Sequence, residues 1–370
     1  MTTPPPSRNP ALAEPSGGSI APRLRVESVA IYLALTFGAA GALLGLVLGQ
    51  FVQLPLSGEW SFGVLAAAAA GISAATVSAL GYWRARSLPG QEWRLELSPV
   101  VFSINLIGVV LVHTVLAILV VLAASFTLNL GFLGLLVEAF WATVLMALSS
   151  GVTVYFVYLS VSTLTTQRMS SLLMTFVVVG TLTAMVTTTD PEWWKTHFSH
   201  LGSFWTLSSL MFNGTLVAAG LLVTAFAVSV ENDSRALVVS RALRRRDAPR
   251  TMATAFILMG ALLAGVGFVP VNVSLLIHNL CAMGLAVVYL GLLIAGPRIL
   301  EGMPRTYFVA SWVFLAATIA SLALFAVGYF GLTAFEIVVF ALIFGWIAVF
   351  IRFLGVADQG QVAPSANAAR

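Results

Sequence analysis

The stretch FWTLSSLMFNGTLVAAGLLVTAFAVSV (residues 204–230) contains no charged side chain, and it is followed by ENDSRALVVSRALRRRDAPR (residues 231–250), the most basic segment of the chain. An apolar run of this length is enough to cross the roughly 30 Å of hydrocarbon in a bilayer, which takes about 20 helical residues. The loop before the run, residues 188–203, has Lys195 as its only Lys or Arg. Basic residues at one end of an apolar run and not at the other are typical of a membrane-crossing helix with its basic end in the cytoplasm.

The same pattern repeats along the chain, where ten apolar stretches are joined by loops that alternate between basic and charge-poor. A lipid-exposed backbone has to satisfy its own hydrogen bonds, so each stretch must be a helix. We therefore predict an all-α fold, a polytopic transmembrane bundle of about ten spans with both termini in the cytoplasm. The expected spans are residues 29–51, 61–83, 100–124, a stretch within 132–161, 171–187, 204–230, a seventh ending at Pro270, 273–295, 307–329 and 332–354.

Composition shifts divide the chain into four parts. Residues 1–26 are rich in Pro, Ser and Gly and have too little apolar content to offset the entropy of ordering. We expect a disordered cytoplasmic tail there and a second one at residues 356–370. Between them, residues 27–170 form a four-span N-terminal region and residues 171–355 a six-span region.

Composition also excludes several classes of protein. The chain is 59% hydrophobic and 9% charged, whereas soluble domains carry about 25% charged residues. Its excess of basic residues follows the expected cytoplasmic loops, so we do not expect nucleic acid as a partner. One cysteine, Cys281, rules out a disulfide framework or a Cys-based metal site within this chain. The sequence contains no G-x-x-x-x-G-K-[ST], G-x-S-x-G or H-E-x-x-H motif.

Few ionisable or amide side chains interrupt the spans, and each is costly in hydrocarbon and therefore a functional hypothesis. Most of them fall in the outer half of the membrane, at the level of the loop with Lys195. We expect a polar pocket open to the outside, formed by Asn213, His278, Asn279, Glu138, Glu336, Ser199 and His200. Alternatively, Glu138 and Glu336 simply reach the outer interface. His113, deep in its span, is expected to be a neutral, hydrogen-bonded bundle residue.

A metal site is an alternative for the same region. His197 and His200 are three residues apart and share a face if the loop is helical. His278 would supply a third imidazole, leaving the fourth position of a tetrahedral zinc ion for water. Asp190 or Glu192 would then be the general base. Apart from this possible zinc ion, no cofactor is expected.

The basic segment offers a second expected contact, with lipid. Residues 234–246 mix Leu and Val with arginine, which fits a short helix lying on the membrane surface. Such a helix attracts anionic lipid by about 1 kcal/mol per basic residue, here through Arg241, Arg244, Arg245 and Arg246. The alternative is a cluster that only fixes the topology.

Short motifs in the second half resemble a known family. They are residues 189–202 (TDPEWWKTHFSHLG), residues 212–213 (FN), residues 267–270 (GFVP) and His278. They are similar to those of the bacterial membrane-protein family known as domain of unknown function 998, which is Frag1/DRAM-like. The resemblance covers about residues 171–354 and implies a helical membrane architecture, but no activity. His200 departs from it, because the family usually has Asp or Glu at that turn.

These observations favour a multi-pass protein of the plasma membrane, which we expect to be a bacterial inner membrane. The expected function is transport or handling of a lipid or small molecule through the outward-facing polar pocket. One alternative is a membrane-embedded, metal-dependent hydrolase that uses His197, His200 and His278. The other is a non-catalytic scaffold subunit.

Overall fold

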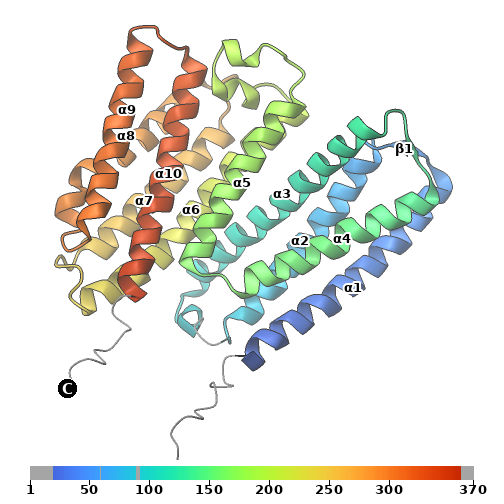
Figure 1. Cartoon of the computed structure of the whole chain (residues 1–370), viewed down its shortest axis with the longest axis horizontal. Helices are drawn as coiled ribbons and strands as arrows, with labels where there is room; N and C mark the ends of the chain where they lie inside the picture. The colour runs from blue at the N-terminus through green and yellow to red at the C-terminus, as the bar shows by residue number, and fades with distance from the viewer. Residues whose placement is uncertain (1–19, 59, 89–91, 360–370) are drawn as a thin grey trace, which may run out of the picture.

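The computed structural model describes residues 20–58, 60–88 and 92–359. In this part of the chain, ten helices are long and apolar enough to cross a membrane, which confirms the predicted all-α, polytopic class. They are α1 (Ile20–Phe51), α2 (Phe62–Ala85), α3 (Pro99–Gly131), α4 (Ala139–Ser162), α5 (Thr166–Thr187), α6 (Leu207–Val239), α7 (Ala248–Phe268), α8 (Leu275–Ile299), α9 (Arg305–Ala326) and α10 (Leu332–Gln359) (Figure 1).

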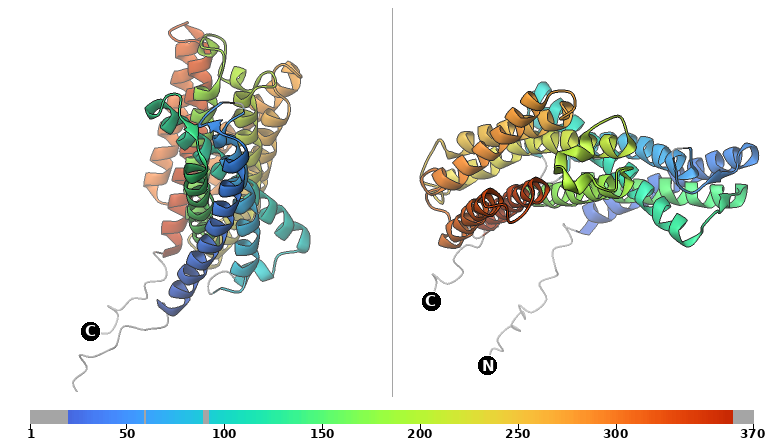
Figure 2. Two further views of the ribbon diagram at one scale, coloured as in Figure 1. Left: turned by 90° about the vertical axis from the view of Figure 1, so that its right-hand side faces the viewer. Right: turned by 90° about the horizontal axis from the view of Figure 1, so that it is seen from above.

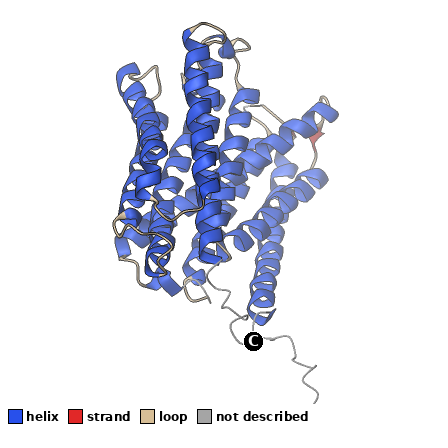
Figure 3. Cartoon of the chain, turned by 60° about the vertical axis from the view of Figure 1, so that its left-hand side comes forward, coloured by secondary structure: helices blue, strands red, loops and turns tan. Residues whose placement is uncertain are grey.

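The remaining elements are short. Strands β1 (Leu54–Pro55) and β2 (Leu136–Val137) form one antiparallel pair, which Figure 3 shows beside the blue helices. Three 3₁₀ turns are η1 (Glu92–Leu95), η2 (Trp193–Lys195) and η3 (Phe198–Gly202). Most of both expected tails, 1–26 and 356–370, lies outside the described residues. The described parts of those ranges, 20–26 and 356–359, are helical and belong to α1 and α10.

Helix ends follow local capping chemistry more than the hydropathy pattern. Thr206 begins α6 with a capping box, in which its side chain and that of Ser209 each accept from the other residue's backbone N–H. At the opposite end, α6 runs past the predicted limit at residue 230 to Val239. The expected surface helix at residues 234–246 is therefore wrong: its first part continues α6, and its second part is a turn before α7.

Successive helices run in opposite directions, so the beginning of α1 and the end of α10 lie at the same end of the bundle (Figures 1 and 2). This end also carries the α6–α7 turn with Arg244, Arg245 and Arg246, and it is called the arginine end below. The opposite end carries the α5–α6 loop with His197 and His200, and it is called the histidine end.

The helices pack as two neighbouring groups, α1–α4 and α5–α10, joined where α3 lies against α5 and α6. In the first group α1 packs closely on α4, because a Cβ on Gly41 would lie 2.6 Å from the carbonyl oxygen of Met146. Gly45 and Gly49 meet the α4 backbone in the same way. These glycines permit the close backbone approach that is common between membrane helices. One continuous buried core nevertheless extends from Ala30 of α1 to Leu354 of α10.

Candidate functional site

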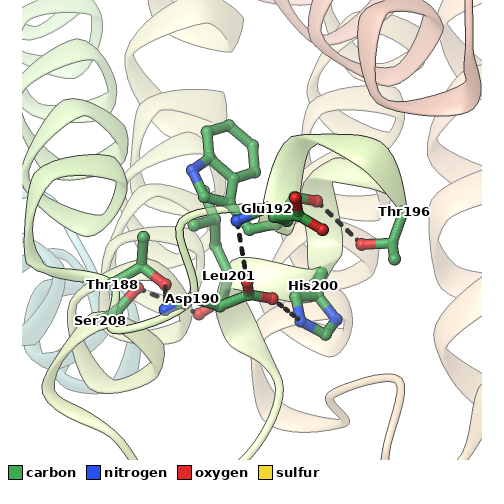
Figure 4. Close-up of polar contacts among 8 residues, drawn as sticks. Thr188, Asp190, Glu192, Thr196, His200, Leu201 and Ser208 are labelled. Atoms are coloured by element: carbon green, nitrogen blue, oxygen red, sulfur yellow. Dashed lines mark hydrogen bonds and ion pairs between the residues drawn. The ribbon is translucent and has the colours of Figure 1, made fainter.

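The α5–α6 loop at the histidine end begins with a turn made by its own side chains. The Thr188 hydroxyl accepts from the backbone N–H of Asp190 at 3.3 Å. Asp190 Oδ1 in turn accepts from the backbone N–H of Glu192 at 2.8 Å, an Asx turn (Figure 4). The local sequence thus fixes where the Asp190 carboxylate points.

The second carboxylate oxygen of Asp190 contacts the imidazole of His200. Asp190 Oδ2 lies 3.1 Å from Nε2 of His200, and both side chains are partly exposed (Figure 4). Glu192, the other acid expected to be a general base, lies 2.5 Å from Nζ of Lys195. Both carboxylates are therefore engaged within the loop.

A carboxylate from the last helix fastens the middle of the loop. Glu336 of α10 accepts from the backbone N–H of Phe198 at 2.6 Å and of Ser199 at 3.3 Å. These groups begin η3, where backbone N–H groups have no partner within the turn. The Phe198 ring packs edge-on against Phe212 of α6 and Phe340 of α10. Together these contacts hold η3 on the bundle.

The end of η3 is fastened by an amide. Asn213 of α6 donates through Nδ2 to the carbonyl oxygen of Gly202 at 2.8 Å. Gly202 is packed so closely on Asn213 that a Cβ would overlap Asn213 Oδ1. The loop is thus attached at both ends of η3, by Glu336 and by Asn213.

His278 enters the same region from α8. It is 4% exposed, and its Nδ1 lies 2.9 Å from the carbonyl oxygen of Val269, just beyond the end of α7. A carbonyl only accepts, so we assign the proton to Nδ1. Within the described residues, Nε2 of His278 has no hydrogen-bond partner.

Three imidazoles share this neighbourhood. The rings of His197 and His200 meet edge-on with centroids 5.7 Å apart. Burial lowers the pKa of His197, and the charges on His200 and His278 lower it further. Neither ring nitrogen of His197 has a hydrogen bond to the part of the chain that the structure describes.

The histidine nitrogens expected to bind zinc do not point toward a common centre in the described residues. Across residues 20–58, 60–88 and 92–359, no group of three His, Cys, Asp or Glu side chains is placed to hold a metal ion. His200 Nε2 faces Asp190, and His278 Nδ1 faces Val269. The three imidazoles are neighbours, and the zinc site stays a prediction.

The side chains of three other expected site residues form no hydrogen bond with the histidines within the described part of the chain. Glu138 precedes α4, beside β2 in the first helix group, and its exposed side chain makes no capping bond. Asn279 is exposed on α8. Ser199 contributes its N–H to Glu336. His113 is a buried bundle residue, as expected, with Nδ1 on Val109 and Nε2 3.0 Å from Oγ of Ser160.

Two aromatic residues were not anticipated as part of the site. Phe204 has a positive φ of 63°, a conformation that is uncommon for a bulky residue. Its ring centroid lies 6.1 Å from that of His200. Trp205 is 99% exposed. The sequence contains one indication of their position: Phe204 and Trp205 directly precede Thr206, the residue that caps α6. They therefore lie where the loop ends and the helix begins.

At the arginine end, part of the basic cluster is neutralised. Arg244 forms an ion pair with Glu301 at 2.8 Å, and Arg245 pairs with Asp247. Arg241 and Arg246 are exposed and form no ion pair with the described residues. The contact of these arginines with anionic lipid stays a prediction.

No family model, no curated protein and no solved structure matches the chain. The resemblance to the family of unknown function stays an expectation drawn from short motifs.

Proposed function

We propose that this integral membrane protein binds a membrane amphiphile, a lipid or a lipid-like small molecule, at its histidine end and handles or transports it there. The observation that carries the proposal is that His278 of α8 lies near His197 and His200 of the α5–α6 loop, which is itself fastened to two helices. Ten helices long and apolar enough to cross a membrane support contact between the bundle and membrane lipid.

The way the loop is fastened supports a binding site. A site holds its ligand well when its side chains are positioned by a rigid supporting structure. Here Glu336 and Asn213 hold η3 against α10 and α6, and Asp190 orients His200. His197 and His278 retain ring nitrogens without a partner among the described residues. Those nitrogens are available to a ligand.

The surroundings of the imidazoles favour a ligand with an apolar part. Phe204 lies against His200, and Trp205 and Trp194 are exposed at the same end. Tryptophan rings accumulate at the level of lipid headgroups, because they have an apolar body and a polar N–H. An amphiphile would place its headgroup near the imidazoles and its chain along these aromatic rings.

The proposal places the histidine end outside the cell. Lys195 is the one lysine in the chain, and it is already paired with Glu192. Basic residues otherwise gather at the arginine end, which the positive-inside tendency assigns to the cytoplasm. Arg241 and Arg246 would then contact anionic lipid of the inner leaflet. The plasma membrane, as a bacterial inner membrane, is the corresponding location.

Native mass spectrometry of the protein released from nanodiscs tests the proposal. We expect a bound amphiphile on the wild-type chain, reduced in His197→Ala and retained in Glu138→Gln. The control carboxylate is exposed and belongs to the other helix group. Equal retention by both variants would contradict the proposal. Stoichiometric zinc lost in His197→Ala would favour the hydrolase, and a co-purifying subunit with no bound amphiphile would favour the scaffold.

A further inference from the structure

The geometry points to a hydroxyl-bearing headgroup as the ligand of the histidine end, with the hydroxyl donating a hydrogen bond to Nε2 of His278. This inference rests on the proposed function and names the chemical class of the amphiphile. A glycerol or sugar headgroup has the required donor.

The first step is the tautomer of His278. Val269 offers its carbonyl oxygen 2.9 Å from Nδ1. Because that oxygen has no proton to give, Nδ1 must carry one. In the neutral imidazole the proton on Nδ1 leaves a lone pair on Nε2. Nε2 is therefore a hydrogen-bond acceptor, and its partner must be a donor.

The second step is the missing partner. His278 is 4% exposed as a residue, yet its Nε2 is not among the buried side-chain atoms that lack a partner in the described residues. This nitrogen is therefore reachable from outside the chain, and water or a ligand can hydrogen-bond to it. Among the described residues, Nε2 has no hydrogen-bond partner.

The third step concerns charge around the site. Asp190 faces His200, Glu336 faces the N–H groups of η3, and Lys195 faces Glu192. The described residues of the histidine end thus offer no unpaired lysine or arginine to a phosphate or carboxylate. Both ring nitrogens of His197 are without a hydrogen-bond partner among the described residues, so this ring can donate or accept a hydrogen bond. This set suits an uncharged hydroxyl group better than an anion.

One substitution separates ligand binding from structure. The side-chain amide nitrogen of Asn occupies the place of Nδ1 of His, so His278→Asn keeps a donor for Val269. The same change removes Nε2, the atom assigned to the ligand. His278→Phe removes both functions. If His278 acts only through Val269, the Asn variant should behave like the wild type.

The experiment uses two photoactivatable lipids with the same diazirine-bearing chains, a diacylglycerol and a phosphatidic acid, in phosphatidylcholine nanodiscs. We expect preferential labelling by the diacylglycerol near Phe204 and Trp205. Loss of one hydrogen bond of about 1 kcal/mol should lower this labelling about five-fold in His278→Asn, with wild-type thermal stability. Glu138→Gln should label like the wild type.

Equal or stronger labelling by the phosphatidic acid would overturn the hydroxyl assignment. Unchanged diacylglycerol labelling in His278→Asn would also overturn it, and would leave water as the partner of Nε2. Either result leaves the proposed function standing if an amphiphile still binds at the histidine end. Absence of labelling there by both lipids, together with no bound amphiphile in native mass spectrometry, would contradict the proposed function itself.

Discussion

The carboxylate of Glu336 on α10 accepts a 2.6 Å hydrogen bond from the backbone N–H of Phe198, a residue 138 positions earlier in the chain. This bond joins the last helix to the loop that carries two of the three clustered histidines. It gives the Glu336 carboxylate a structural role, which is to accept hydrogen bonds from the N–H groups at the start of η3.

Replacing Glu336 by Ala should therefore loosen the loop without unfolding the bundle. An uncompensated N–H of a partly buried turn costs about 1–3 kcal/mol, so amides of Phe198 and Ser199 should exchange hydrogen faster. Hydrogen exchange read by mass spectrometry over residues 193–203 measures this. The matched control is Glu138→Gln, which should leave exchange in the loop unchanged. Equal exchange in the wild type and Glu336→Ala would show that the bond does not hold η3.

Gly202 and Asn213 should behave as one coupled pair. Gly202→Ala places a methyl group on Asn213 Oδ1, so it should lower thermal stability more than an ordinary surface substitution. Asn213→Ala removes the nearest obstacle, Asn213 Oδ1, together with the hydrogen bond to Gly202, whereas the Phe212 ring stays 2.9 Å from the added Cβ. The double variant should then lose less stability than the two single losses added, as expected for residues in contact. Additive losses in a thermal-unfolding cycle would contradict the packing described.

Gly45→Ala should disturb the contact between α1 and α4. The added methyl group would meet the backbone of Ala142, and backbone atoms cannot move aside as a flexible side chain can. Gly291→Ala in α8 is the control, because a Cβ there has no neighbour within 4 Å. We expect a lower unfolding temperature for Gly45→Ala alone. If both variants unfold together with the wild type, the close α1–α4 contact is contradicted.

His197 should titrate below the ordinary histidine value. Burial is the main cause of its lowered pKa, followed by the charges of His200 and His278. The folded chain therefore favours the neutral ring. The contribution of His197 to the free energy of unfolding is fully present above the ordinary histidine pKa of about 6.5. It is lost as the pH falls from there through the lower pKa that His197 has in the folded chain. An NMR titration of the imidazole measures it; a midpoint at or above the ordinary value would be inconsistent with this environment.

The helices were predictable from the sequence, because a span needs only enough apolar residues and an uncharged interior. The topology also put Asn213, His278 and Glu336 near one end. Their partners were not predictable, since all three bond to backbone groups, namely Gly202 O, Val269 O and the N–H of Phe198. Backbone acceptors and donors have no sequence signature.

The position of Glu138 shows a second limit of the sequence. Hydropathy gives the depth of a residue in the membrane, but it does not give the place of its helix around the bundle. Glu138 lies at the expected end of the bundle, at the start of α4, yet α4 packs with α1 and α2 in the other helix group. Which helices become neighbours depends on which of their faces fit together. Because these faces differ little in polarity, the sequence does not show which ones pack.

The sidedness of the bundle is the claim on which the proposed site depends, and thiol labelling tests it most directly. In a Cys281→Ser background, which removes the native thiol, single cysteines replace exposed Thr189 at the histidine end and exposed Ser240 at the arginine end. With a membrane-impermeant maleimide on intact cells, we predict labelling at position 189 and none at position 240 until the membrane is permeabilised. The opposite pattern would place the histidines in the cytoplasm and contradict an amphiphile site at the outer face.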